Sequence, residues 1–427
     1  MEGPTFGSVR DVRCAFRMKT VLLIGTLDTK GPEIAYVRDR LHALGVGTVV
    51  ADSGILGEPL DIVPDVTHAE VARLGGTTIE ALQQAGSRGK AVHGMLAGLR
   101  TLAMNLYQEG RLHGAVALGG AEGAVLGASA MMGLPIGVPK VIVTPIASGH
   151  RRFGPLIGTK DVMVVHSVVD ILGLNPISTA VFDNVAAALA GMVEHGGPMR
   201  LTGDQRRVAM TMLGNTTKAV MMIRDRLHER GFEAVIFHSN GVGGPAMEEL
   251  AEAGLFAGVI DYTTDELTDE LVGGFHAATP TRLRRIGQLG LPQVVVPGCI
   301  DFSVHGRPEA VPARLAGRAM YMHNPEFTLV RTLPDEMRQL GGIFAERLNE
   351  ATGPVAVMVP TRGLSIPSVP GGEFWDPEAD AGFLAALRAD LRRDIPVSTH
   401  DHHINDPEFA RAVADRFVAL LDSRGQN

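Results

Sequence analysis

The sequence predicts an α/β protein with two Rossmann-like, doubly wound parallel-sheet subdomains that face a shared cleft. Short β-branched runs alternate with helix-length amphipathic segments, which is the pattern of βαβ units. The strand runs are almost continuously apolar, as expected for parallel sheets buried on both faces. Glycine is abundant, at 52 of 427 residues, and aromatic residues make up only 5%. This composition favours glycine-rich α/β loops over a β-sandwich with aromatic packing.

The expected elements follow one another regularly through both halves. In the first half the expected strands are 20–25, 48–52, 114–118, 140–144 and 161–166, and a helix is expected at 33–44. In the second half the expected strands are 208–213, 234–238, 258–261, 293–296, 355–359 and 397–400, with helices at 217–230, 246–253, 335–350 and 407–421. This alternation is typical of doubly wound folds.

The chain length suits two or three domains of about 150 residues each. We expect a flexible arm, an N-terminal subdomain, a linker and a C-terminal subdomain, at residues 1–19, 20–196, 197–206 and 207–427. The linker lies in a polar, glycine-rich stretch, HGGPMRLTGDQR. Segments 38–49 and 224–235 share Arg-Asp-Arg-Leu-His and align without gaps. They indicate two similarly built halves; the alternative is chance similarity between two ordinary β-loop-α units.

Charge and cysteine content limit the possible partners. Lys plus Arg is 39 and Asp plus Glu is 47, which gives a net charge of −8. Nucleic-acid binding is not expected, because phosphate contacts need a basic face. The two cysteines, Cys14 and Cys299, lie far apart, which fits a reduced compartment and gives no zinc motif. No signal segment or long apolar stretch is recognisable, so we expect a cytoplasmic protein with no membrane span.

The first expected strand leads into a turn with the sequence GTLDTKGP. Anions favour such a helix start, because orphan N–H groups and the positive end of the helix dipole face them. We expect Gly25, Thr26 and Lys30 to meet nucleotide phosphates. Asp28 and Thr29 are candidate ligands of Mg²⁺. The turn is not a P-loop, since no G-x-x-x-x-G-K-[ST] occurs. The alternative is a polar βα turn with a surface lysine.

A second glycine-rich loop follows the strand GAVAL. Gly119, Gly120 and Gly123 would let a ligand approach the backbone at the carboxyl end of a buried strand. The alternative is close packing of helix on strand, which also needs small residues. Ser148 and Gly149 lie in a neighbouring hydroxyl- and glycine-rich loop, and the same cleft could collect them.

The second half contains a further glycine loop, HSNGVGGPA. Gly241, Gly243 and Gly244 are candidate nucleotide contacts. With the alanine that follows, the spacing satisfies G-x-G-x-x-[GA], and Asp261 ends the next strand, where a ribose partner of NAD would sit. The dinucleotide interpretation is disfavoured because His-Ser-Asn separates the strand from the first glycine.

Four residues of the second half are candidates for acid–base or anion chemistry. His238 can move protons near neutral pH, and Asp261 or Glu266 could act as a general acid or base. Arg362 could hold a carboxylate or phosphate bidentately. The alternatives are a histidine hydrogen-bonded in a turn, carboxylates that cap a helix, and a capping arginine.

A histidine-rich segment, HDHHINDP, lies near the C-terminus at residues 400–407. A metal site is one interpretation. It is disfavoured because the side chains of adjacent residues point apart. The simpler alternative is that Asp406 and Pro407 begin the last helix.

Five motifs carry a resemblance to a known family. They are GTLDTKGPE, LPIGVPKVIVTPIASG, GTKDVMVVHSVVDILGLNPIS, FHSNGVGGPAMEEL and HHINDPEFA. Together they resemble the ATP-binding domain family of the tomato mosaic virus resistance protein and its bacterial relatives, over residues 21–421. The family's Asp-Thr-Lys is retained, whereas Leu27 stands where the plant protein looks to have a small residue.

The resemblance implies two Rossmann-like subdomains, binding of adenine nucleotide, and a homodimer or higher homo-oligomer. In the plant protein this domain precedes a TIM barrel that looks like a phosphoenolpyruvate hydrolase, so a separately encoded TIM-barrel partner is expected here. Antiviral action does not carry over. The leading hypothesis is therefore a cytosolic, metabolic protein that binds ATP with Mg²⁺. The alternatives are a hydrolase or lyase for a small carboxylated or carbonyl metabolite in the cleft, and an interaction scaffold stabilised by nucleotide.

Overall fold

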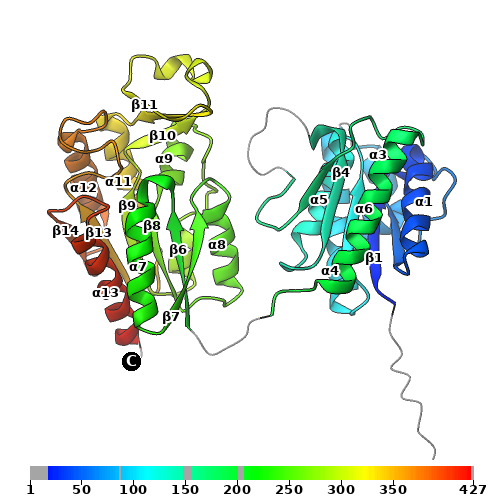
Figure 1. The fold of residues 1–427 in the computed structure, drawn as a ribbon, viewed down its shortest axis with the longest axis horizontal. Coiled ribbons are helices and arrows are strands. Elements are labelled where there is room, and N and C mark those ends of the chain that lie inside the picture. The colour runs from blue at the N-terminus through cyan, green and yellow to red at the C-terminus, as the bar shows by residue number, and fades with distance from the viewer. Residues whose placement is uncertain (1–17, 86–87, 148–155, 201–205, 425–427) are drawn as a thin grey trace, which may run out of the picture. The chain divides into compact units, whose positions relative to one another are not determined.

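A computed structural model describes residues 18–85, 88–147, 156–200 and 206–424. The chain divides into two compact units, which Figure 1 shows as ribbons. Among the described residues, unit 1 comprises those up to residue 200 and unit 2 those from residue 206. Residues 1–17 of the expected N-terminal arm and residues 201–205 of the expected linker lie outside the described residues.

Unit 1 is built on one parallel sheet of five strands in the order β2-β1-β3-β4-β5. Its strands and helices are β1 (Thr20–Gly25), α1 (Leu27–Ala43), β2 (Gly47–Asp52), α2 (His68–Leu74), α3 (Ile79–Gln83), α4 (Arg88–Gln108), β3 (Gly114–Leu118), α5 (Ala121–Met132), β4 (Lys140–Thr144), β5 (Met163–His166) and α6 (Pro176–His195). Alternate side chains of the strands enter two separate cores. Helices α1 and α6 cover one face of the sheet, and helices α2 to α5 cover the other.

Unit 2 is built on a parallel sheet of six strands in the order β14-β13-β9-β8-β6-β7. Its strands and helices are β6 (Arg206–Met212), α7 (Thr217–Glu229), β7 (Phe232–His238), α8 (Gly243–Glu252), β8 (Gly258–Thr263), α9 (Asp265–Val272), α10 (Arg284–Gln288), β9 (Gln293–Gly298), β10 (Phe302–His305), β11 (Met320–Asn324), β12 (Phe327–Arg331), α11 (Pro334–Leu348), β13 (Val355–Pro360), α12 (Pro377–Asp390), β14 (Val397–His400) and α13 (Pro407–Arg424). Helices α7 and α13 cover one face, and α8 to α12 cover the other.

The two units share one strand order. Numbered from its own first strand, each parallel sheet begins 2-1-3-4-5, and unit 2 adds a sixth strand at the edge. The repeated Arg-Asp-Arg-Leu-His segment falls in the helix after the first strand of each unit. Leu41 in α1 and Leu227 in α7 are both fully buried in it. The repeat seen in the sequence therefore occupies the same topological position in both halves.

The doubly wound α/β class predicted from the sequence is confirmed, and the expected strands are present with small shifts at their ends. The main element that the sequence did not predict is an antiparallel sheet in unit 2, β10-β12-β11. It stands at one end of the parallel sheet (Figure 1). Its outer strand β11 is mostly exposed, so this strand lacks the apolar run on which the prediction relied.

Helix α6 is long and apolar enough to cross a membrane by length and composition, which alone is a weak sign. No other helix of the described residues passes the same test. Its buried side chains, among them Phe182, Val185 and Leu189, pack with α1 and the sheet in a core of unit 1. That packing accounts for its composition.

Candidate functional site

Each parallel sheet has a topological switch point, at which neighbouring strands lead into helices on opposite faces. In unit 1, β1 leads to α1 on one face and β3 leads to α5 on the other. In unit 2, β6 leads to α7 and β8 leads to α9, again on opposite faces. Open α/β sheets bind ligands in the crevice outside the carboxyl ends of such strands. Unit 1 has a cavity at this position, and unit 2 has one at the carboxyl ends of β6 and β7.

The unit 1 cavity has a volume of about 480 Å³. It is lined by Thr26, Asp28, Thr29, Ser53, Gly54, Ile55, Leu56, Leu82, Gln83, Ala91 and Glu122. Three of these residues come from the turn after β1 and one from the start of α5. The loop after β2 and helices α3 and α4 make up the rest of the wall, which is mainly apolar but includes Ser53 and Gln83. Of the second glycine loop only Glu122 lines the cavity, whereas Gly119, Gly120 and Gly123 do not.

The turn after β1 differs from the expected open loop. Helix α1 begins at Leu27, and Lys30 lies inside it with φ −123° and ψ 15°. The Leu27 N–H donates to Asp52 Oδ1 at 3.1 Å, so a protein carboxylate already occupies part of this helix start. A Cβ on Gly25 would lie 2.6 Å from Ile34 Cδ1, which explains that glycine by packing. Gly25 and Lys30 do not line the cavity, whereas Thr26, Asp28 and Thr29 do.

The start of α5 is more open. Gly120 is its N-cap, without a capping side chain, and a Cβ placed there would meet no atom within 4 Å. Gly119 is a packing glycine, since its Cβ would lie 2.7 Å from the Cα of Gly123. Ser53, at the end of β2, is buried and lines the cavity, and its Oγ has no hydrogen-bond partner among the described residues. Ser148 and Gly149 lie outside the described residues.

The unit 2 cavity has a volume of about 250 Å³. It is lined by Leu213, Gly214, Asn215, His238, Asn240, His276, Val304, His323, Asn324, Phe327 and Leu329. These residues come from the ends of β6 and β7, from the segment after α9, and from the antiparallel sheet. Three imidazoles and three carboxamides are therefore the polar side chains of this cavity.

Two of these histidines have pKa values shifted in opposite directions. His276 is 6% exposed, and its Nδ1 lies 2.8 Å from Asp265 Oδ2. Burial acts to lower the pKa of His276, but the combined effect of Asp265, Asp269 and Glu266 outweighs it and raises that pKa. Burial and the nearby His276 lower the pKa of His238. A neutral His238 and a cationic His276 can thus coexist near neutral pH.

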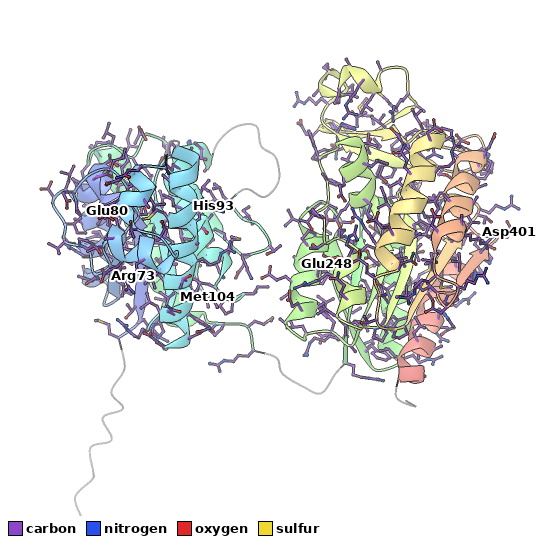
Figure 2. The ribbon with its side chains drawn as sticks, turned by 180° about the vertical axis from the view of Figure 1, so that it is seen from behind. Arg73, Glu80, His93, Met104, Glu248 and Asp401 are labelled. Atoms are coloured by element: carbon purple, nitrogen blue, oxygen red, sulfur yellow. The ribbon has the colours of Figure 1, made fainter. Side chains whose placement is uncertain are left out.

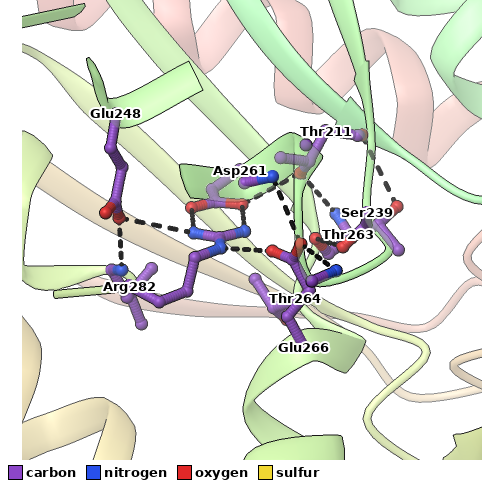
Figure 3. A network of polar contacts seen from close by, with 12 residues as sticks. Thr211, Ser239, Glu248, Asp261, Thr263, Thr264, Glu266 and Arg282 are labelled. Atoms are coloured by element: carbon purple, nitrogen blue, oxygen red, sulfur yellow. Dashed lines mark hydrogen bonds and ion pairs between the residues drawn. The ribbon is translucent and has the colours of Figure 1, made fainter. Parts of the chain in front are cut away.

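Asp261 and Glu266, which the sequence assigned to acid–base chemistry, instead form internal ion pairs. Both are fully buried and bind Arg282, which is itself fully buried (Figure 3). Neither lines the cavity. A third carboxylate near Arg282, Glu248, accepts a hydrogen bond from the Leu283 N–H at 2.8 Å. We therefore assign Asp261 and Glu266 a structural role, because their oxygens bond to protein donors.

The glycine loop before α8 is explained by the same cluster. Glu266 Oε1 accepts hydrogen bonds from Gly241 and Gly244 N–H at 2.7 and 3.2 Å. A Cβ on Gly243 would lie 1.9 Å from the carbonyl oxygen of His238. The loop fits the α8 start around an internal carboxylate. The donors that the sequence offered to a nucleotide at Gly241 and Gly244 are consequently already used.

Arg362 and the histidine-rich segment do not assemble a site. Arg362 forms an ion pair with Asp401, whose side chain is 76% exposed and lies at the outer margin of unit 2 (Figure 2). His403 contacts the carbonyl oxygen of Ser365, and His400 packs on Phe409. Among the described residues no three His, Cys, Asp or Glu side chains are placed to hold a metal ion. Residues 400–407 thus form no three-ligand cluster in the part of the chain that the structure describes.

The sequence interpretation missed three residues of these cavities. His276 lies in the loop after α9, and its partner Asp265 is the first residue of α9. Only the fold brings these two side chains together. Ser53 follows the carboxyl end of the second strand. The rule that α/β sheets bind ligands at the carboxyl ends of their strands, which pointed to Gly119, could also have found Ser53. His323 lies in strand β11, whose hairpin with β12 the sequence did not predict.

Comparisons with known proteins locate the chain among its relatives. Models of the N-terminal and C-terminal domains of an uncharacterised protein family, UPF0261, match residues 19–197 and 205–421. A UPF0261 protein of Clostridium tetani is 37% identical over 405 residues, covering 95% of this chain and 99% of the relative. A UPF0261 protein of Mesorhizobium japonicum is 36% identical, with coverage of 95% and 99%. The ToMV resistance protein Tm-1 of Solanum lycopersicum is 35% identical over 94% of this chain and 55% of its own length.

Proposed function

The chain belongs to the uncharacterised protein family UPF0261, and from that premise we propose that it binds ATP, with Mg²⁺, in the unit 1 cavity. The observation that carries the proposal is the position of the cavity. It lies at the switch point of the unit 1 sheet, between the turn after β1 and the start of α5. The sequence motifs around Asp28 and Gly120, which prompted the nucleotide hypothesis, belong to these two segments.

The α5 start supplies the phosphate side of the proposed site. Its first turn has no capping side chain, and the open space beside Gly120 leaves room for close approach to the backbone. Orphan N–H groups and the helix dipole favour an anion at such a start. The unpartnered Ser53 Oγ adds a buried polar group in the same wall. We propose that both contact phosphate oxygens.

Magnesium is required by the charges of the wall. Asp28 and Glu122 line the cavity, and none of its described lining residues is Lys or Arg. Phosphates beside two carboxylates would be repelled without a cation between them. Mg²⁺ is commonly held by one or two carboxylates together with nucleotide phosphates, so the donor set fits this ion. Asp28, with Thr29 beside it, would hold the metal, which would neutralise phosphate charge when bound.

The opposite wall suits a nucleobase. Ile55, Leu56, Leu82 and Ala91 form an apolar surface, and Gln83 lies among them. The Gln83 side chain donates to the carbonyl oxygen of Ile55 at 2.7 Å, which fixes the loop after β2 against α3. A cavity with a mainly apolar wall and a few placed polar groups is typical of small-molecule sites.

The test is calorimetric titration of the full chain with ATP in the presence and absence of Mg²⁺. Gly120→Val should weaken binding without unfolding the chain, because a Cβ there meets no atom within 4 Å and the added side chain stands at the α5 start, where we propose that phosphate binds. Gly197→Val is the matched control, since a Cβ at Gly197 also meets nothing within 4 Å. Asp28→Asn should weaken binding with Mg²⁺ more than without it. Equal affinities of the Gly120 and Gly197 variants would refute the site.

The wider role that we propose is metabolic and cytoplasmic, for a homodimer or higher homo-oligomer with a TIM-barrel partner. The tomato relative supports the partner, because this chain spans only 55% of its length, so that relative contains a substantial further part. Sedimentation of the full chain, alone and with a TIM-barrel protein encoded beside it, tests both statements. A monomer that sediments independently of that protein would contradict them.

A further inference from the structure

We propose that the unit 2 cavity is a second ligand site, which binds a small monoanionic carboxylate through His276. This site is separate from the proposed nucleotide site, since all of its lining residues belong to unit 2. It lies at the carboxyl ends of β6 and β7, with His276 contributed by the segment after α9. The two halves would therefore share a fold but hold different ligands.

The position of His276 is fixed by backbone and side-chain contacts. Its ring Nδ1 lies 2.8 Å from Asp265 Oδ2. Its backbone N–H donates to Asp269 Oδ2 at 2.7 Å, and Asp269 Oδ1 accepts from the Val304 N–H at 2.9 Å. Asp269 thus joins the segment that carries His276 to strand β10 of the antiparallel sheet. An imidazole held in this way is ordered before any ligand arrives, which lowers the entropic cost of binding.

The groups around His276 determine its charge. From α9, the carboxyls of Asp265, Asp269 and Glu266 face it, and His238 faces it from the end of β7. Glu266 is paired with Arg282, and burial raises the pKa of Asp269 to about 7. Asp265 therefore provides the closest negative charge, and the pKa of His276 is raised. The carboxylates therefore favour the imidazolium form of His276 on the cavity wall, with Asp265 as its counter-ion.

The lining residues favour a carboxylate over a phosphate or a polyanion. Among the described residues that line the cavity, none is Asp, Glu, Lys or Arg. The ordered His276 ring, whose charge Asp265 partly balances, and the carboxamides of Asn215, Asn240 and Asn324 offer hydrogen-bond donors to a single carboxylate. Leu213 and the antiparallel sheet supply an apolar wall for a short carbon chain. A phosphate dianion or a nucleotide would meet too little positive charge here.

The experiment uses the full chain and ligand-observed saturation-transfer NMR with 2-oxobutyrate as probe. Butanone, which lacks the carboxylate, is the comparison probe, and inorganic phosphate, which carries no protons that this method observes, is added as a competitor of 2-oxobutyrate. We expect saturable binding of 2-oxobutyrate at about pH 6, and binding weaker by about tenfold or more at about pH 9, because His276 loses its proton as the pH rises. Butanone, and phosphate judged by displacement, should bind at least about tenfold more weakly than 2-oxobutyrate at about pH 6.

Two substitutions identify the residue responsible. His276→Gln should weaken binding by about tenfold or more, while His228→Gln, an exposed histidine of α7 outside the cavity, should not change it. If circular dichroism shows that His276→Gln does not fold, the test rests on the pH profile of wild-type binding and on the variant His323→Gln, whose native side chain is exposed. The inference fails if 2-oxobutyrate binds independently of pH, if phosphate or butanone binds as well, or if folded His276→Gln keeps the affinity.

Discussion

Arg282 and Asp261 form a bidentate ion pair inside unit 2, with neither side chain exposed to solvent. Nη1 and Nη2 of Arg282 donate to Oδ2 and Oδ1 of Asp261 at 2.5 and 2.6 Å (Figure 3). Nε of Arg282 donates to Glu266 at 2.5 Å, and the Arg282 carbonyl oxygen accepts from Arg347. The guanidinium of Arg282 therefore connects strand β8 and helix α9, and its backbone carbonyl connects them to helix α11.

Arg282→Met should destabilise unit 2 by about 3–5 kcal/mol, because it leaves Asp261 and Glu266 buried without their cation. Urea unfolding followed by tryptophan fluorescence measures the loss in unit 2 alone, since Trp375 is the only tryptophan of the chain. Arg362→Met is the matched control. That arginine has a surface partner, Asp401, and surface ion pairs contribute little. Equal stability of the two variants would contradict the structural role given to Arg282.

Glu248 should make unit 2 less stable as the pH rises towards neutrality. Burial raises the pKa of this carboxyl from 4.5 to about 7, and Glu248 Oε2 has no hydrogen-bond partner among the described residues. The folded protein therefore keeps a proton that the unfolded chain has lost. This contribution to stability is fully present below pH 4.5 and disappears as the pH rises to about 7.

Glu248→Gln isolates that contribution. The variant stays neutral at every pH, so the stability of wild type minus variant should fall between about pH 5 and pH 7, by up to about 1.4 kcal/mol per pH unit. The pKa values of Asp269 and Asp380 are also raised to about 7, but both residues are present in the two proteins and cancel. A difference that is constant across this range would show that Glu248 is ionised in the folded state.

Gly243→Ala should destabilise unit 2 by about 1–3 kcal/mol, because the added Cβ would lie 1.9 Å from the backbone oxygen of His238. Gly342→Ala provides a control of opposite sign. Gly342 lies within α11, and its Cβ would meet only Asp390 at 3.9 Å, so alanine should stabilise the helix by about 0.5–1 kcal/mol. Trp375 fluorescence reports both variants. If Gly243→Ala leaves the free energy of unfolding unchanged, packing does not explain this glycine, and the loop is again a candidate ligand contact.

Much of the fold could be predicted because a buried parallel strand is recognisable from its own short stretch of sequence. A run such as Gly114–Leu118 is apolar at every position and fully buried, as a central parallel strand must be. The β11–β12 hairpin gave no such signal, because Met320–Asn324 is largely exposed and pairs only with one neighbour. Strand runs therefore predicted the sheets, while the segment that lines the unit 2 cavity was missed.

The site was predicted less completely, because residue type and loop position do not reveal what a side chain contacts. The sequence places both Asp261 and Asp28 at or just after the carboxyl end of an expected strand, where α/β sheets bind ligands. Asp28 lines a cavity, whereas Asp261 bonds to Arg282, twenty-one positions along the chain. Arg282 itself is an arginine in a polar segment, TPTRLRR, which the sequence shows no reason to bury. Only the fold distinguishes a carboxylate that faces a cavity from one that is paired with an internal cation.

Unit 1 expressed alone, as residues 18–200, should fold and bind ATP with Mg²⁺ as the full chain does. Both of its cores are composed of its own residues, and every residue that lines its cavity lies within this range. Cooperative unfolding by circular dichroism checks the fold, and calorimetry should give an affinity within about threefold of the full chain. The Gly120→Val fragment is the control that should bind more weakly. A folded fragment without affinity, beside a full chain that binds, would mean that residues of unit 2 complete the nucleotide site.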